Sequence, residues 1–147
     1  MITQKARYAF KALIALARAG ETGLAARDVA AREQIPQAFL EQILLDLKRA
    51  GLVGSRRGRE GGYFLARPAT DITIGNVLRL VDGPVAPLPC LSRNSYRPCA
   101  DCSDEATCAV RHVFAEAYDA TVAVLDRTTL ADSLVTAGTG DMAALGA

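Results

Sequence analysis

Apolar and polar residues alternate with a helical period along the first fifty positions of the chain. A first apolar stripe begins after Thr3, a residue type that caps helices, and Gly20 stands where that helix should end. A shorter pattern without a strong N-cap predicts a second helix over residues 26–33. The third stripe lies between Pro36 and Gly51 and is the most regular: Leu40, Ile43, Leu44 and Leu47. The spacing therefore predicts three helices, with a tight turn between the last two.

The next segment changes from helical spacing to two short extended runs. Residues 52–53 and 63–65 are apolar and strand-like, and glycines lie between them. The same connection carries three arginines: Arg56, Arg57 and Arg59. Two short helices joined by a tight turn form a helix-turn-helix, and a hairpin with a basic tip directly after them favours a winged helix over an ordinary helical pair. A further short helix, capped by Thr73, should close this unit over residues 74–81.

Beyond residue 83 the pattern indicates a linker, a loop and one long helix. Pro84, Pro87 and Pro89 predict a stiff, extended linker. The stretch after the last cysteine predicts a long amphipathic helix with one stripe: Val110, Val113, Phe114, Ala117, Thr121, Val124 and Leu125. This stripe is too apolar to face water, so the helix either packs on its own domain or pairs with a second chain.

All four cysteines lie within one polar, turn-rich stretch of nineteen residues: Cys90, Cys99, Cys102 and Cys108. Core-filling thiols would be scattered among apolar positions, so the cluster predicts a metal or cluster ligand set, a redox switch or a structural staple. No run approaches the ~18 to 20 apolar residues that a membrane span needs, and the N-terminus lacks the order of a secretory signal. We therefore expect a cytoplasmic protein with no membrane partner, whose thiols are kept reduced.

The net charge is only +1, but it is unevenly distributed. Residues 1–83 carry 13 Lys and Arg against 8 Asp and Glu, whereas residues 84–147 carry 4 against 8. A basic front half suggests a polyanion-binding surface, although solvated helix faces alone can also be charged. The polar start of the third helix supplies candidates for contact with base edges: Gln37, Ala38, Glu41 and Gln42. On the wing, Arg57 and Arg59 are the best candidates for phosphates or a narrow minor groove, with Arg56 beside them.

Six short motifs cover nearly the whole chain: ARYAF (6–10), FLEQIL (39–44), GLV (51–53), RGREGGYFL (57–65), ITIGNVL (72–78) and TTLADSL (128–134). Together they resemble the Rrf-type winged-helix transcriptional regulators, the IscR/NsrR-like family. The resemblance implies a homodimer in which long C-terminal helices cross and three cysteines of each chain hold an iron–sulfur cluster.

The expected fold is mainly α with a small β-hairpin wing. A winged helix-turn-helix DNA-binding domain occupies residues 1–83, and a cysteine-containing sensor loop occupies residues 84–108. A dimerisation helix and C-terminal segment follow over residues 109–137, and residues 138–147 form a flexible tail.

The cysteine loop departs from the family pattern in its spacing. Only Cys102 and Cys108 keep the family's gap, Cys99 is an addition, and His112 lies one step later than the histidine ligand of some relatives. We hypothesise that the four cysteines bind an iron–sulfur cluster, 2Fe–2S or 4Fe–4S, or that three of them do so with His112 as a fourth donor. A structural zinc site and a direct thiol–disulfide switch are the alternatives.

The predicted function is that of a dimeric transcriptional regulator, expected to repress. It would bind a palindromic double-stranded DNA operator and sense cluster status or redox and nitrosative stress through the cysteines. A cysteine-dependent enzyme is the alternative of another class. The chain has a single histidine, no phosphate loop and no Ser-His-Asp constellation, so we expect no enzyme.

Overall fold

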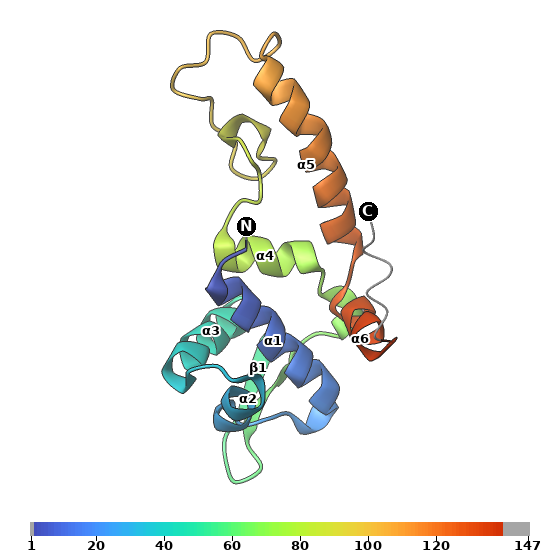
Figure 1. Cartoon of the computed structure of the whole chain (residues 1–147). Helices are drawn as coiled ribbons and strands as arrows, with labels where there is room; N and C mark the ends of the chain where they lie inside the picture. Colours follow the sequence, from blue (N-terminus) through green and yellow to red (C-terminus); the bar gives the residue numbers. More distant parts are fainter. Residues whose placement is uncertain (1, 140–147) are drawn as a thin grey trace.

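The computed structural model describes residues 2–139, which form a helical body, a β-hairpin and one projecting long helix (Figure 1). The elements follow in the order α1 (Gln4–Ala19), η1 (Gly20–Thr22), α2 (Ala26–Glu33), α3 (Gln37–Arg49), β1 (Val53–Arg56), β2 (Gly62–Leu65), η2 (Ala69–Asp71), α4 (Ile74–Asp82), η3 (Pro89–Leu91), α5 (Ala109–Arg127) and α6 (Leu130–Thr139). The predicted architecture, mainly helical with a two-stranded antiparallel wing, is confirmed. None of the described helices is both long and apolar enough to span a bilayer.

Local signals set the limits of the first three helices. The Thr3 hydroxyl accepts the backbone N–H of Ala6 at 3.1 Å and starts α1, and Gly20 ends this helix with a φ of 63°. As predicted, α2 has no side-chain cap, and it ends at Gln34 in the left-handed conformation. The chain leaves α3 through Gly51, whose φ of 75° favours glycine.

The apolar faces of these helices meet in one core. The predicted stripe of α3 is fully buried: Leu40, Ile43, Leu44 and Leu47. It packs with Leu13 and Leu16 of α1, with Ile72 just ahead of α4, and with Leu130 of α6. Because burial of a leucine-sized side chain contributes about 1.5–3 kcal/mol, this stripe fixes α3 and turns its polar face to solvent.

The wing is a short antiparallel hairpin beside α3. Val53 of β1 pairs with Leu65 of β2, and Leu24, just ahead of α2, forms a further bridge to Tyr63. This bridge attaches the hairpin to the helix-turn-helix. The hairpin tip projects from the body at the end opposite to α5 (Figure 1).

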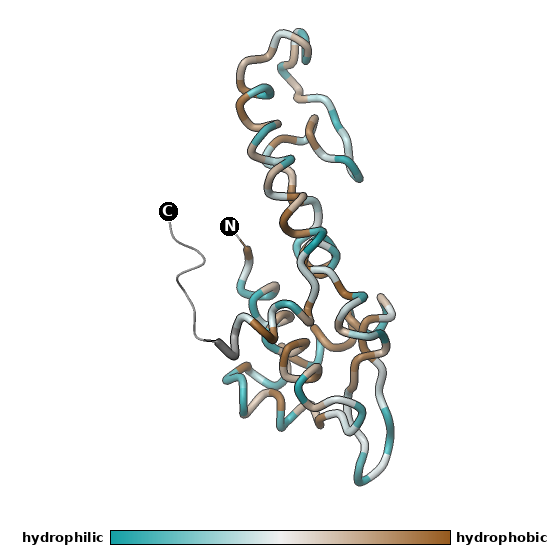
Figure 2. The backbone as a smooth tube through the Cα atoms, turned by 90° about the vertical axis from the view of Figure 1, so that its right-hand side faces the viewer, coloured by the Kyte–Doolittle hydropathy of each residue, from teal (hydrophilic) through white to brown (hydrophobic). Residues whose placement is uncertain are grey.

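The cysteine loop and α5 form an arm at the other end of the molecule. Thr73 caps α4, which ends at Asp82, one residue beyond the predicted limit. The loop then leaves the body and returns to α5 at Cys108. Figures 1 and 2 show that the loop and the first turns of α5 stand away from the helical body. The fold therefore separates the cysteines from the wing.

The sequence pattern predicted the long helix but not the separate helix α6 within the C-terminal segment. The chain turns after Thr128, and α6 packs against α1 with Leu130 fully buried. This helix runs to Thr139, so the predicted tail over 138–147 begins within α6. Residues 140–147 lie outside the described residues.

Candidate functional site

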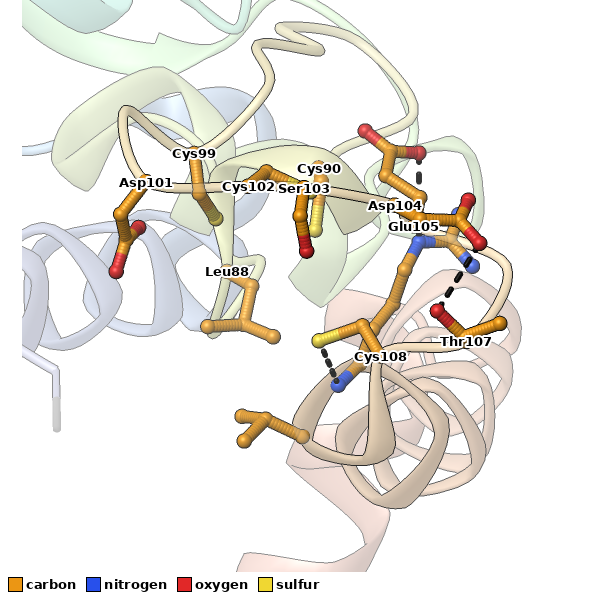
Figure 3. A pocket seen from close by; sticks show the side chains of 12 residues that line it. Leu88, Cys90, Cys99, Asp101, Cys102, Ser103, Asp104, Glu105, Thr107 and Cys108 are labelled. Atoms are coloured by element: carbon orange, nitrogen blue, oxygen red, sulfur yellow. Dashed lines mark hydrogen bonds and ion pairs between the residues drawn. The ribbon is translucent and has the colours of Figure 1, made fainter.

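All four cysteines line one cavity of about 380 Å³ between the loop and the start of α5 (Figure 3). Cys90 is buried in η3, Cys108 is the N-cap residue of α5, and Cys99 and Cys102 lie on the loop between them. All four thiols are free. The fold therefore brings every predicted sulfur ligand to one space.

The donors have the chemistry of a cluster site, but they do not stand in a ligating arrangement. Four thiols are the ligand type that iron–sulfur clusters use, so the residues fit such a group. Within residues 2–139, no three His, Cys, Asp or Glu side chains are grouped so that they could hold a metal ion. Binding of a cluster would therefore require a change in the loop that brings the four sulfur atoms closer together.

His112, the possible fourth ligand, does not line the cavity. Its Nε2 atom lies 2.9 Å from the carbonyl oxygen of Ala106 and joins the loop to α5. The structure thus brings the four cysteines together without this histidine.

Burial and neighbouring groups disfavour the charged form of two thiols. Burial raises the pKa of Cys99, and the nearby Cys90 thiol adds to the effect. Burial also raises the pKa of Cys102, with a further contribution from the Glu105 carboxylate. A metal that binds these sulfur atoms as thiolates must displace their protons.

Side-chain contacts hold the loop to α5 on two sides. Tyr96 donates a hydrogen bond of 2.5 Å to Glu105 Oε1, which raises the pKa of Tyr96. Glu105 Oε2 lies 3.6 Å from Arg111 Nε in α5, and we call these three residues the loop clasp. Arg93, elsewhere on the loop, forms an ion pair of 2.8 Å with Asp119 of α5. The loop is therefore fastened to α5 even though the thiols are unbridged.

Arg111 is a lining residue that the sequence analysis missed. It lies in the first turn of α5, and its backbone N–H reaches Cys108 Sγ at 3.4 Å. Its Nε atom is buried and has no hydrogen-bond partner. A capping residue and the residue three positions later share one helix face, so Cys108 followed by Arg111 was a usable signal.

The predicted base-reading residues form the exposed face of α3. All four are solvent-exposed: Gln37, Ala38, Glu41 and Gln42. Gln37 Nε2 donates to Glu41 Oε1 at 3.0 Å, and Gln42 Nε2 donates to Asp46 Oδ1 at 3.2 Å. Asp46 also pairs with Lys5 of α1 at 2.9 Å. This face is exposed, and two of its side chains are ordered by hydrogen bonds within α3.

The three wing arginines are not equivalent. Arg56 donates to the carbonyl oxygen of Glu21 at 2.8 Å and stacks on Phe64, with its guanidinium 4.4 Å from the ring centre. Arg57 and Arg59 are exposed at the tip. Arg59 and Gln37 line the same surface hollow, so the wing tip and the start of α3 adjoin. All three arginines are exposed, but Arg56 is held by its contacts with Glu21 and Phe64.

The predicted apolar stripe of α5 is largely uncovered within the chain. Four of its large members are exposed, among them Val113 by 70% and Phe114 by 44%, whereas Leu125 is half-buried. The buried side chains of α5 are instead Tyr118 and Val122, which lie outside that stripe. The helix therefore has one apolar side that packs on its own chain and another that remains open.

Known proteins are similar to this chain in sequence and in fold. Residues 2–136 match the Rrf2 family, described as iron-dependent transcriptional regulators. An rrf2-like protein of Rhodobacter capsulatus, assigned as an HTH-type transcriptional regulator, is 50% identical over 138 residues, which are 91% of this chain and 92% of that protein.

Solved structures of other regulators have a similar fold. CymR, the global cysteine regulator of B. subtilis, has a TM-score of 0.76 at 32% identity, covering 92% of this chain and 96% of that chain. The IscR of T. potens has a TM-score of 0.74 at 29% identity, covering 97% of this chain and 91% of that one. The chain therefore belongs to the Rrf2 family of HTH-type transcriptional regulators, related to IscR and CymR, and is not an enzyme.

Proposed function

We propose that this regulator binds a palindromic operator as a homodimer and that an iron–sulfur cluster controls its affinity for DNA. The cluster ligands would be the four cysteines: Cys90, Cys99, Cys102 and Cys108. The observation that carries the proposal is the single cavity lined by all four thiols. The description of the family as iron-dependent agrees with it.

The description of the family as iron-dependent favours a cluster over zinc. Cys99 and Cys102 form one CxxC pair, which is half of a common zinc site, but the sequence has no second CxxC pair. A direct thiol switch is less favoured, because the raised pKa values of Cys99 and Cys102 reduce the reactive thiolate fraction.

The cysteines connect two elements whose separation matters for DNA binding. A bound cluster would supply redox chemistry at this position. Ligation by Cys90 and Cys108 would tie the segment after α4 to the first turn of α5. Without that tie, the loop is held by contacts such as Arg93 with Asp119 and Tyr96 with Glu105.

A path of polar contacts runs from α5 toward the DNA-binding face. Arg79 of α4 pairs with Asp126 of α5, and Asp82 at the end of α4 accepts hydrogen bonds from Thr3, the cap of α1. Lys5 of α1 in turn pairs with Asp46 of α3. A change in the position of α5 would therefore reach α3 in each subunit.

The open apolar face of α5 is the proposed dimer contact. Val113, Phe114 and Val124 lie on it at helical spacing and are exposed. Two paired α5 helices would fix the distance between the two α3 helices, and half-sites about 34 Å apart tolerate little change in that distance.

The proposal is tested by anaerobic purification, iron and sulfide analysis, and operator binding with and without the chromophore. We expect iron and sulfide in the native protein, and loss of both in each single cysteine-to-serine variant. His112→Ala is the matched control and should keep its full iron content. A colourless, iron-free protein after anaerobic reconstitution with iron and sulfide would overturn the proposal, as would equal operator affinity of the loaded and unloaded forms.

A further inference from the structure

Arg111, a residue that lines the cysteine cavity, has a buried N–H group that makes no hydrogen bond. Its side chain lines the cavity together with all four thiols. The Nε atom is buried and makes no hydrogen bond, because the carboxylate of Glu105 stays 3.6 Å away. A buried N–H without an acceptor costs free energy, so the structure is more favourable when an acceptor occupies that position.

The charges around the cavity show what kind of acceptor that would be. Three acidic residues line it beside the thiols: Asp101, Asp104 and Glu105. Arg111 is the one cationic residue among the lining side chains. A cluster with four thiolate ligands carries a net negative charge, and it would enter a space already surrounded by carboxylates. One guanidinium beside the sulfur atoms would offset part of that repulsion.

We propose that Arg111 is the charge partner of the bound cluster, donating from its guanidinium to a cluster or cysteine sulfur and so raising the reduction potential of the cluster. This inference rests on the proposed function. The sign follows from electrostatics. Reduction adds an electron to an already negative group, and a nearby positive charge or an N–H donor to sulfur stabilises the reduced form more than the oxidised form.

The position of Arg111 suits this role better than direct ligation. An arginine stays protonated in proteins, so it can donate to sulfur but cannot give a lone pair to iron. Its backbone N–H already contacts Cys108 Sγ at 3.4 Å, which keeps the side chain within one helical turn of a proposed ligand. Arg111 therefore acts as a hydrogen-bond donor to the cluster and leaves ligation to the cysteines.

The test compares Arg111→Gln and Arg111→Lys with the unchanged protein after anaerobic reconstitution with ferrous iron and sulfide. The readouts are iron and sulfide per chain and the midpoint potential, followed by absorbance and by electron paramagnetic resonance. We expect R111Q to shift the midpoint to more negative potential and R111K to restore part of the shift. Arg127→Gln, which removes an exposed arginine at the other end of α5, is the matched control and should leave the potential unchanged.

The outcomes distinguish failure of the proposed function from failure of the role inferred for Arg111. If the unchanged protein takes up no iron and sulfide, the proposed function fails, and this inference fails with it. If the unchanged protein binds a cluster, and R111Q has the same midpoint potential and the same iron and sulfide content, only the role of Arg111 is overturned. If R111Q loses its cluster and R111K holds no more than R111Q, positive charge is not what Arg111 supplies, and the inference is likewise overturned. Recovery of cluster content in R111K supports it.

Discussion

At the scale of single residues, the three wing arginines differ in their contacts: Arg56 contacts Glu21 and Phe64, whereas Arg57 and Arg59 are the proposed DNA contacts. We expect Arg57→Ala combined with Arg59→Ala to weaken binding to every DNA sequence. The slope of log affinity against log salt should fall by about 3.6 for the dimer, because its two chains together lose four arginines and each phosphate contact contributes about 0.9. Binding titrations at several salt concentrations measure both quantities.

Arg56→Ala is the comparison for this pair. It removes the stacking on Phe64 and the hydrogen bond to Glu21, so it should lower the free energy of unfolding by about 1 kcal/mol. Its salt slope should change less than that of the double variant. An unchanged slope in the double variant would contradict the assignment of the wing tip as a phosphate contact.

Asp46 links the first helix to the reading helix through a titratable group. The hydrogen bond from Lys5 lowers the pKa of Asp46 below its ordinary value of 3.8. The stabilisation by ionised Asp46 is therefore fully present above about pH 4, and it is lost as the pH falls through the lowered pKa of the folded state. Asp46→Asn should reduce stability by about 0.5 kcal/mol near neutral pH. Melting curves of the two proteins should converge in acid, and a constant difference down to about pH 2 would count against the pair.

At the scale of elements, the joint between α4 and α5 depends on a glycine. A Cβ atom on Gly75 would collide with the carboxylate of Asp126 and press on the guanidinium of Arg79. Gly75→Ala should therefore displace this partly exposed ion pair, whose loss of about 0.2–1 kcal/mol is opposed by a gain in helix propensity of up to about 1 kcal/mol. Denaturant unfolding should show little net change. In an Asp126→Ala background the collision is gone, so the same change should raise the free energy of unfolding by the gain in helix propensity. The absence of a gain there would mean that another contact opposes the Cβ atom.

The sequence predicts those elements whose signals are local. Thr3 and Gly20 mark both ends of α1, and the leucine stripe of α3 has one face to bury, so their limits could be predicted closely. The separate helix α6 was missed, although its start carries a capping arrangement: Thr129 Oγ1 accepts the N–H of Asp132 at 3.2 Å, and Asp132 accepts the N–H of Thr129 at 2.8 Å. The predicted stripe ends at Leu125, and residues 128–134 entered the sequence argument only as a family motif, so this capping signal was not used.

At the scale of the whole molecule, the site was predictable in its ligands but not in its surroundings. The four cysteines stand together in the sequence, so their clustering could be predicted without the fold. The loop clasp of Tyr96, Glu105 and Arg111 depends on how the loop returns to α5, which no local pattern specifies. The same limit applies to α5 itself. Its sequence is apolar on two sides, and only the fold shows that Tyr118 and Val122 face the chain while the predicted stripe stays open.

That open stripe leads to the prediction that tests the proposed assembly. Val113→Glu combined with Phe114→Glu places two charges on the exposed apolar face, where pairing of two chains would bury them without partners. We expect a folded monomer by sedimentation and circular dichroism, with a loss of about 100-fold or more in affinity for the palindrome, because two linked half-site contacts become single ones. Ala123→Glu, exposed on another side of α5, is the matched control and should remain a dimer with full affinity. A double variant that stays dimeric would mean that the two chains contact each other through another surface. The cysteine loop could then change the distance between the two α3 helices only through contacts that do not involve pairing of the α5 helices.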